Sequence, residues 1–461
     1  LTPRLTFDVR LKNYFAFIRP FTHQAAIMKY STETQSILSP GTFSLLIATF
    51  MTIVTPTEAV EPSSTKATGV ISEEFGANSS NWDTAPMNMF SFTLTERIFP
   101  TLIISQGDGP VARLRYAPRQ VDAAQLIVSD PATGRAITVD QLLNRRIQNN
   151  GLIVIHKGRI VHESYRNGFS RELRHINMST SKSFCGMMAQ IALEKGLFKE
   201  DDLATKYVPE LRGKEAWKDL TVRHVWDMRD GTKFVENYED ESSDVRIQDR
   251  ATGWRTRGEN DPEGIKGFIK TSKNLAVKIN PTGKVFNYAS IQTDILGLIV
   301  QEASGQPLAE FFEEHFWSKL GAEHDAGYGT DGFGQPIAQG AISMTLPDFA
   351  RVAMMVMNKG RNAKGEQVVA ESFFDDLVTP NKMLRDAFPP QYKSLMSPTG
   401  NYRSQFWVLD AEKKQFMMVG VYGQVAYFDY TNDFAFVSFG SYPIAKDALL
   451  VQSLGSLIGA M

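Results

Sequence analysis

Residues 175–197 read HINMSTSKSFCGMMAQIALEKGL, and this stretch decides how the rest of the chain is interpreted. From Phe184 onward, apolar residues recur at steps of three and four, which predicts a helix with one buried face that ends at Gly196. Ser179 and Lys182 then lie on the first turn of this helix and on the same side of it. The beginning of a helix also offers free backbone N–H groups. A hydroxyl, an amine and free N–H donors in one place are the components of an acyl-transfer site.

The S-x-x-K motif alone is weak evidence, because a capping serine followed by a solvated lysine has the same pattern. Here the lysine lies beside an apolar face, and partial burial favours the neutral form of an amine. Cys185 is the only cysteine of the chain, so an intrachain disulfide is excluded. We interpret Cys185 as a small buried residue, since it has no evident histidine partner that would make it a catalytic thiol.

The composition is that of a globular protein. The chain has 461 residues, 43% of them hydrophobic and 22% charged, which is enough for a large core or two lobes. Its 49 basic and 51 acidic side chains show no basic excess that would indicate a nucleic-acid partner. The seven histidines are scattered, and His156 and His162 are expected in strands. We therefore predict neither a metal nor a cofactor.

The N-terminal region has the features of a targeting segment. Residues 1–27 are basic and unpatterned, and we interpret them as an over-extended start before Met28. Residues 28–59 predict a signal peptide, because an apolar run of about a dozen residues precedes a small-x-small site. A membrane anchor is the alternative. Residues 60–80 are small and polar, which predicts a linker. We expect a periplasmic or secreted protein without a stable membrane partner.

Two segments flank the motif helix. The sequence LIVIHKGRIVHESY at 152–165 predicts a β-hairpin that turns at Lys157-Gly158. After the helix, Thr221 is a predicted N-cap, and residues 232–262 form a long polar stretch that we interpret as a loop or lid. Its aromatic residues Tyr238 and Trp254 are candidates for substrate contact.

Two further motifs follow. PTGKVFNYAS at 281–290 leads into an apolar run that predicts a helix ending at Gly305, with Tyr288 on the turn before it. Farther on, FMMVGVYGQV at 416–425 and residues 435–441 predict strands, with DYTND at 429–433 as the turn between them. Between these motifs, Thr345 is the predicted N-cap of an apolar helix.

Taken together, these motifs resemble the serine β-lactamase/penicillin-binding superfamily in its class C-like branch, and within it 6-aminohexanoate-dimer hydrolases and related esterases. The resemblance covers residues from about 81 to about 443 and includes segments 85–110, 152–165, 221–238 and 338–351. It implies an α+β fold of the β-lactamase/transpeptidase type within a hydrolase domain at 81–461. An antiparallel sheet would be flanked by helices and joined by a mainly helical lobe at about 185–334, with the site in the cleft between them.

The resemblance also implies roles for particular residues. Ser179 would be the nucleophile, and Lys182 with Tyr288 would form the base and acid pair, provided that the lysine lowers the pKa of the tyrosine. The backbone N–H groups of Ser179 and Gln424 would form the oxyanion hole. The family's third motif would correspond to Val421-Tyr422-Gly423, whose Tyr422 and Gly423 are predicted to contact substrate together with Tyr238.

The third motif lacks the lysine or histidine that normally pairs with the carboxylate of a β-lactam or peptide. This favours hydrolysis of small-molecule esters or linear amides, although an arginine elsewhere in the cleft could replace the cation. A β-lactamase, a D,D-peptidase or penicillin-binding protein, and a sensor that is acylated without turnover remain the alternatives. An α/β-hydrolase is disfavoured, because the sequence contains no G-x-S-x-G.

Overall fold

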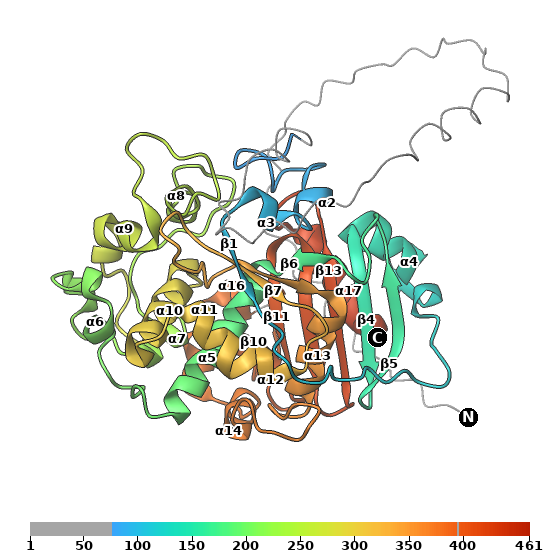
Figure 1. Cartoon of the computed structure of the whole chain (residues 1–461). Coiled ribbons are helices and arrows are strands. Elements are labelled where there is room, and N and C mark those ends of the chain that lie inside the picture. The colour runs from blue at the N-terminus through green and yellow to red at the C-terminus, as the bar shows by residue number, and fades with distance from the viewer. Residues whose placement is uncertain (1–75, 394–395) are drawn as a thin grey trace, which may run out of the picture. The chain divides into compact units, whose positions relative to one another are not determined.

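A seven-stranded antiparallel sheet forms the core of the computed structural model, which describes residues 76–393 and 396–461 (Figure 1). The hairpin predicted at 152–165 is confirmed, because β4 pairs with β5 around Lys157-Gly158. The sheet has the order β5 (Arg159–Tyr165), β4 (Asn149–His156), β13 (Phe434–Gly440), β12 (Gln424–Asp429), β11 (Gln415–Gly420), β10 (Phe406–Asp410) and β9 (Asn401–Arg403).

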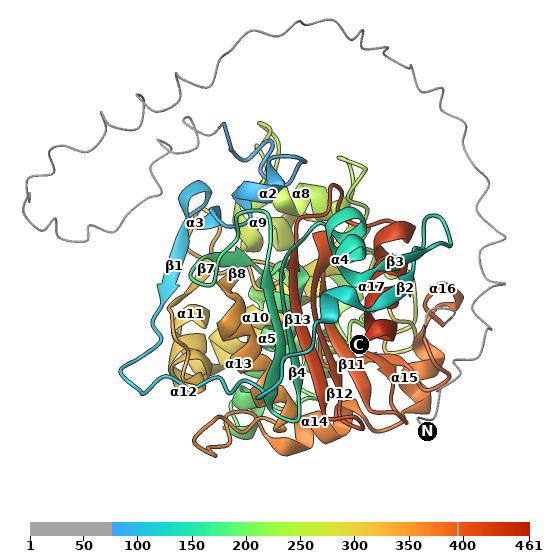
Figure 2. The same cartoon turned by 90° about the vertical axis from the view of Figure 1, so that its right-hand side faces the viewer.

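The two faces of the sheet pack against different helices, because successive side chains of a strand point to opposite sides. Ile153 and Ile155 of β4 belong to the larger core, which includes α5 (Ser181–Glu194) and α13 (Leu346–Met357). Leu152 and Val154 belong to a second cluster with α4 (Val139–Leu142) and α17 (Ala448–Ala460). In Figure 2, α4 and α17 lie together on one side of the strands, beside the hairpin of β2 (Ile127–Ser129) and β3 (Ala136–Thr138).

The described residues from Ser181 to Leu320 form helices and loops that pack beside the sheet. The long helix α10 (Ser290–Ser304) lies against α5. The other helices of this region are α6 (Ala204–Tyr207), α7 (Val222–Trp226), α8 (Asp244–Ala251), α9 (Gly264–Thr271), α11 (Leu308–Phe312) and α12 (Ser318–Leu320).

A smaller antiparallel sheet lies next to this helical region. Its order is β1 (Thr101–Ile104), β7 (Ala326–Gly329), β8 (Ile342–Thr345) and β6 (Arg174–Ile176). In the chain, β8 leads directly into α13, and a short turn joins β6 to α5. The predicted N-cap of α13 is confirmed, since the Thr345 side chain accepts from the Asp348 N–H. Short helices complete the fold: α2 (Asn88–Ser91), α3 (Thr95–Ile98), α14 (Glu371–Leu377), α15 (Lys382–Ala387) and α16 (Pro390–Lys393).

Several predictions fall beyond this description. The start segment 1–27, the signal peptide 28–59 and residues 60–75 of the linker lie outside the described residues. Within the described ranges, no helix combines the length and the apolar character that crossing a membrane requires.

Two predicted elements differ from the structure. The strand predicted at 416–425 is two strands, β11 and β12, because the chain turns at Val421–Gly423, where Tyr422 and Gly423 have φ values of 64° and 96°. The polar stretch 232–262 contains helix α8. This helix is short and mostly polar, with Val245, Ile247 and Ala251 as its apolar residues, and an Arg246–Asp249 ion pair joins positions three residues apart on it.

Candidate active site

Ser179 lies on a single 3-10 turn, Met178–Thr180, between β6 and α5. Met178 has a φ of 48°, an uncommon conformation for a residue with a side chain. The turn is held from both sides, because Asn177 N–H donates to Ile342 O at 2.8 Å and Thr180 N–H donates to Asn177 O at 3.2 Å. Ser179 therefore has a fixed position at the N-terminal end of α5, where its side chain is 8% exposed.

Lys182 lies on the first turn of α5 and points at this serine. Its Nζ is 2.8 Å from Ser179 Oγ and also donates to Gln339 O at 2.8 Å. The side chain is 1% exposed. Burial lowers the pKa of the Lys182 amine, while the carboxylates of Glu236, Asp294 and Asp249 act in the opposite direction. The amine is thus more easily deprotonated than an ordinary lysine and lies within proton-transfer distance of a hydroxyl.

The carbonyl that holds Lys182 is itself positioned by α10. Asp294 Oδ1 accepts from Gln339 N–H at 3.0 Å, which fixes the loop that carries the carbonyl. Burial raises the pKa of the Asp294 carboxyl. Neither Gln339 nor Asp294 was predicted from the sequence. For Asp294, a single acid within the apolar run IQTDILGL was a usable signal.

Tyr288 reaches the same place from the loop before α10. Lys182 Nζ lies 5.3 Å from the centroid of its ring, and the ring stacks on Trp407 at 5.5 Å. Loss of water raises the pKa of Tyr288, the Glu236 carboxylate raises it further, and the nearby Ser179 hydroxyl acts the other way. The structure therefore brings Ser179, Lys182 and Tyr288 together. We expected Lys182 to lower the pKa of Tyr288. Burial has the largest effect on this pKa instead, and raises it.

A small hollow of about 40 Å³ opens beside Ser179. Tyr238 and Trp254, the two aromatic residues singled out in the polar stretch, both line it. The Tyr238 hydroxyl donates to Glu236 Oε1 at 2.6 Å. An outer hollow of about 390 Å³ shares Tyr238 and Tyr422 with the inner one, so the two adjoin.

Comparison with known proteins identifies the family of the chain. Residues 135–441 match the sequence model of the Beta-lactamase family. The chain belongs to the beta-lactamase family. It is 30% identical over 368 residues to 6-aminohexanoate-dimer hydrolase of Paenarthrobacter ureafaciens, which covers 79% of this chain and 88% of that protein.

Solved structures of the beta-lactamase fold resemble the chain as well. A Bacillus anthracis protein described as a candidate 6-aminohexanoate-dimer hydrolase superposes with a TM-score of 0.73, at 23% identity, over 83% of this chain and 95% of its own. A penicillin-binding protein of Bacillus halodurans gives a TM-score of 0.52 at 16% identity, over 70% and 99%. The predicted fold class and the predicted enzyme class, a hydrolase of the serine β-lactamase type, are confirmed.

In this beta-lactamase-family chain, the third motif differs from the prediction in detail. Tyr422 lines the hollow, and its hydroxyl donates to Asp83 Oδ2 at 3.0 Å. The structure does not bring Gly423 and Gln424 there. A Cβ on Gly423 would face Ile147 and Gly440, and Gln424 pairs with Gly420 in the sheet while its side chain donates to Gly440 O. The physical reason is the turn at 421–423, where positive φ at Tyr422 and Gly423 redirects the chain into β12.

Val421 is the neighbouring residue of this turn that reaches the hollow. It lines the hollow and directly follows Gly420, where a Cβ would lie only 2.8 Å from Asn177 O and 3.0 Å from Met178 Cβ. The end of β11 therefore packs on the turn that carries the serine. The N–H of the next residue, Tyr422, donates to Ala445 O.

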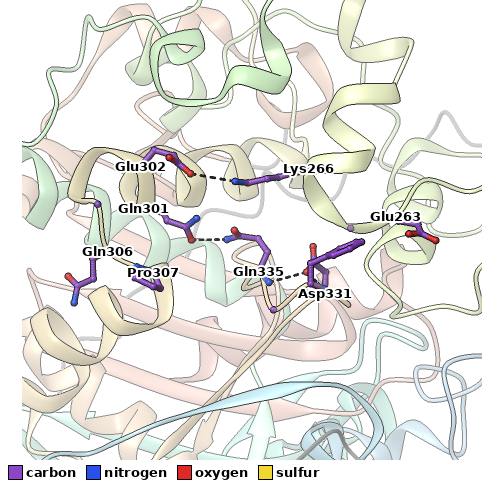
Figure 3. A pocket seen from close by; sticks show the side chains of 12 residues that line it. Glu263, Lys266, Gln301, Glu302, Gln306, Pro307, Asp331 and Gln335 are labelled. Carbon is purple, nitrogen blue, oxygen red and sulfur yellow. Dashed lines mark hydrogen bonds and ion pairs between the residues drawn. The ribbon is translucent and has the colours of Figure 1, made fainter. Parts of the chain in front are cut away.

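A larger hollow of about 710 Å³ lies elsewhere in the beta-lactamase domain, between α9, α10 and the turn before β8 (Figure 3). Lys266 pairs with Glu302 there at 3.5 Å, and Gln335 Nε2 donates to Gln301 Oε1 at 3.2 Å. None of the predicted site residues lines it. These four side chains are already paired, and none of the site residues lies there, so the smaller hollow at Ser179 remains the candidate active site.

Proposed function

We propose that the chain is a serine hydrolase that cleaves small-molecule esters or linear amides through an acyl-enzyme on Ser179. The observation that carries the proposal is the 2.8 Å contact between Lys182 Nζ and Ser179 Oγ in a buried setting that lowers the pKa of the amine. The class of substrate follows from the relative, whose name is 6-aminohexanoate-dimer hydrolase. The third motif supports it as well, because Val421 and Tyr422 stand where the family has a cation, and Arg246, which lines the same hollow, is already paired with Asp83 and Asp249.

The proposed reaction begins at the serine. The neutral Lys182 amine accepts the Ser179 proton as Oγ forms a bond to the substrate carbonyl carbon, and the carbonyl electron pair moves to oxygen. The oxyanion accepts hydrogen bonds from the Ser179 and Val421 N–H groups, in place of the predicted Gln424. Removing one such donor typically costs about 10²- to 10³-fold in kcat.

The tetrahedral species then collapses. The bond to the leaving nitrogen or oxygen breaks, and the leaving atom takes a proton from the Tyr288 phenol, which is resupplied from protonated Lys182. Water repeats the sequence on the acyl-enzyme, and its proton passes to Lys182. Tyr288 suits the role of donor because its raised pKa keeps the phenol protonated.

The test combines substitution with labelling. Ser179→Ala and Lys182→Ala should each abolish turnover of p-nitrophenyl esters and 6-aminohexanoate oligomers, with circular dichroism spectra like that of the unchanged protein. A fluorophosphonate should label the peptide that contains Ser179. Unchanged hydrolysis by Ser179→Ala would reject the proposal, and strong nitrocefin turnover would instead favour a β-lactamase. A stable adduct with one equivalent of product would favour a sensor.

We also propose that the enzyme is exported through the signal peptide predicted at 28–59. Mass spectrometry of the mature N-terminus tests this, because cleavage after Ala59 is the expected result. A mature chain that begins near residue 1 would reject export by this segment.

A further inference from the structure

A single carboxylate, that of Glu236, connects the two tyrosine segments of the site. Its Oε1 accepts from the Tyr238 hydroxyl at 2.6 Å and from Ser290 Oγ at 2.5 Å. Its Oε2 accepts from the Ser290 backbone N–H at 2.8 Å. Glu236 is half-buried, so these bonds form in a partly dry environment, where contacts with a charged group are strongest.

The position of these partners in the chain matters. Ser290 is the first residue of α10 and stands two residues after Tyr288, while Tyr238 stands two residues after Glu236. A negative charge at a helix N-terminus also interacts favourably with the helix dipole. The Glu236 carboxylate therefore joins the loop that carries Tyr238 to the start of α10, just after the loop that carries Tyr288.

Glu236 also acts on the reacting amine through its charge. Of the groups that favour the charged form of Lys182, the Glu236 carboxylate has the largest effect, followed by Asp294, Asp249 and Cys185. The uncharged ring of Tyr288 also lies close to the amine, with its centroid 5.3 Å from Lys182 Nζ. Three donors hold the two oxygens of Glu236, so its carboxylate is fixed in place by the site.

We propose that Glu236 is a positioning residue of the active site, which holds Tyr238 and Tyr288 in place and sets the charge environment of Lys182. This proposal rests on the proposed serine-hydrolase function and deepens it. Sequence reasoning missed the residue, because a glutamate in a polar loop looks like an ordinary surface charge.

The decisive variant is Glu236→Gln. The amide keeps one acceptor oxygen, but it loses the charge and places an NH₂ group opposite the Ser290 N–H. We expect kcat for a p-nitrophenyl ester to fall about tenfold to a hundredfold, which corresponds to the loss of a hydrogen bond to a charged group. The acid limb of the kcat/KM profile should move to lower pH, since removing a nearby negative charge further disfavours charged Lys182. Rates are read at the isosbestic wavelength of p-nitrophenol, so that its own ionisation does not distort the profile.

Ser290→Ala is the matched control. It removes one hydrogen bond to the same carboxylate and leaves the charge in place, so kcat should fall modestly while the acid limb stays where it is. Glu236→Asp keeps the charge but shortens the side chain, and should lower kcat with a smaller movement of the limb. If Glu236→Gln does not fold, wild-type kcat in Glu236→Asp would overturn the proposal.

The outcomes separate this inference from the proposed function. If the fluorophosphonate labels Ser179 and the acid limb of folded Glu236→Gln does not move, the role of Glu236 is overturned alone. A merely structural role would lower kcat and leave the limb unmoved. If the label goes to another residue, the proposed function and the role of Glu236 fall together.

Discussion

The lysine and the tyrosine of the site respond to burial in opposite directions. Burial lowers the pKa of Lys182 and raises the pKa of Tyr288, because in each case it disfavours the charged form. Near neutral pH the phenol therefore keeps its proton, while the amine is the group that can lose one. In the proposed mechanism, Ser179 therefore passes its proton to the amine first, and the phenol is the donor to the leaving group.

The assignment predicts different pH profiles for two substitutions. Lys182→Met should lower kcat/KM by roughly 10²- to 10⁴-fold, the usual contribution of a general base, and remove the acid limb. Tyr288→Phe should lower kcat but keep the limb, since activity would still appear as pH rises through the pKa of Lys182. The measurement is kcat/KM for a p-nitrophenyl ester between pH 5 and 10. A limb that disappears in Tyr288→Phe and persists in Lys182→Met would make the phenol the base.

At the scale of residues, the sequence predicted the contact between two side chains that are a fixed number of positions apart on one helix. Ser179 and Lys182 share a helix end, so three residues of separation were enough to predict their contact. The donor on the sheet could not be located in this way. Val421 rather than Gln424 lines the hollow because Tyr422 and Gly423 adopt positive φ, and the apolar pattern of 416–425 carries no sign of that turn.

At the scale of elements, α5 is buried far beyond one face. All residues from Ser181 to Ala192 are buried, and its serines find partners, since Ser183 Oγ donates to Gln405 O at 2.7 Å. Gly186 marks the closest approach to another segment. A Cβ there would lie 2.3 Å from the backbone oxygen of Ser404. The turn that carries Ser404 is therefore packed directly on the helix that bears Lys182.

This contact predicts the effect of Gly186→Ala. The added methyl group meets backbone rather than a flexible side chain, so the turn has to move, and we expect a loss of about 1–3 kcal/mol in the free energy of unfolding. Urea denaturation followed by tryptophan fluorescence measures it. Gly455→Ala on α17 is the matched control, because nothing lies within 4 Å of its Cβ position. Helix propensity should make that variant neutral or more stable by about 0.5–1 kcal/mol. If both substitutions changed the free energy of unfolding by the same amount, the close approach at Gly186 would not affect stability.

The sequence predicted the helices with apolar periodicity better than the charged ones. The ends of α5 and α10 were found because Gly196 and Gly305 adopt positive φ just beyond them. Helix α8 was missed, because its stability depends on ion pairs and on packing against distant segments, neither of which leaves a periodic pattern.

At the scale of the whole molecule, Asp227 joins the helical region to the main sheet. Its carboxylate follows α7 and accepts from Arg223 Nη1 at 3.2 Å, Arg229 Nη2 at 3.0 Å and Arg403 Nη1 at 2.7 Å, the last at the end of β9. Burial alone would raise the pKa of Asp227, but the charges of Arg223, Arg403 and Arg229 outweigh it and hold the pKa well below its ordinary value. Sequence periodicity could not predict this contact, just as it could not predict that β4 pairs with β13. Both join segments that are remote in the chain.

The Asp227 network predicts how stability depends on pH. A carboxyl with a depressed folded-state pKa stabilises the fold above its unfolded pKa of about 3.9, and loses that contribution as pH falls through the folded value. Asp227→Asn should lower the free energy of unfolding by about 3–5 kcal/mol at pH 7, because it removes the carboxylate that pairs with the buried Arg229, while Arg223 and Arg403 keep their ion pairs with Glu200 and Asp376. The difference from the unchanged protein should narrow below pH 4, as measured by urea titration at several pH values. Asp386→Asn is the control, since Asp386 pairs on the surface with an exposed Lys382 and should change stability little at any pH. If the two proteins differed in the free energy of unfolding by the same amount at pH 7 and at pH 3, the ionisation of Asp227 would not contribute to stability.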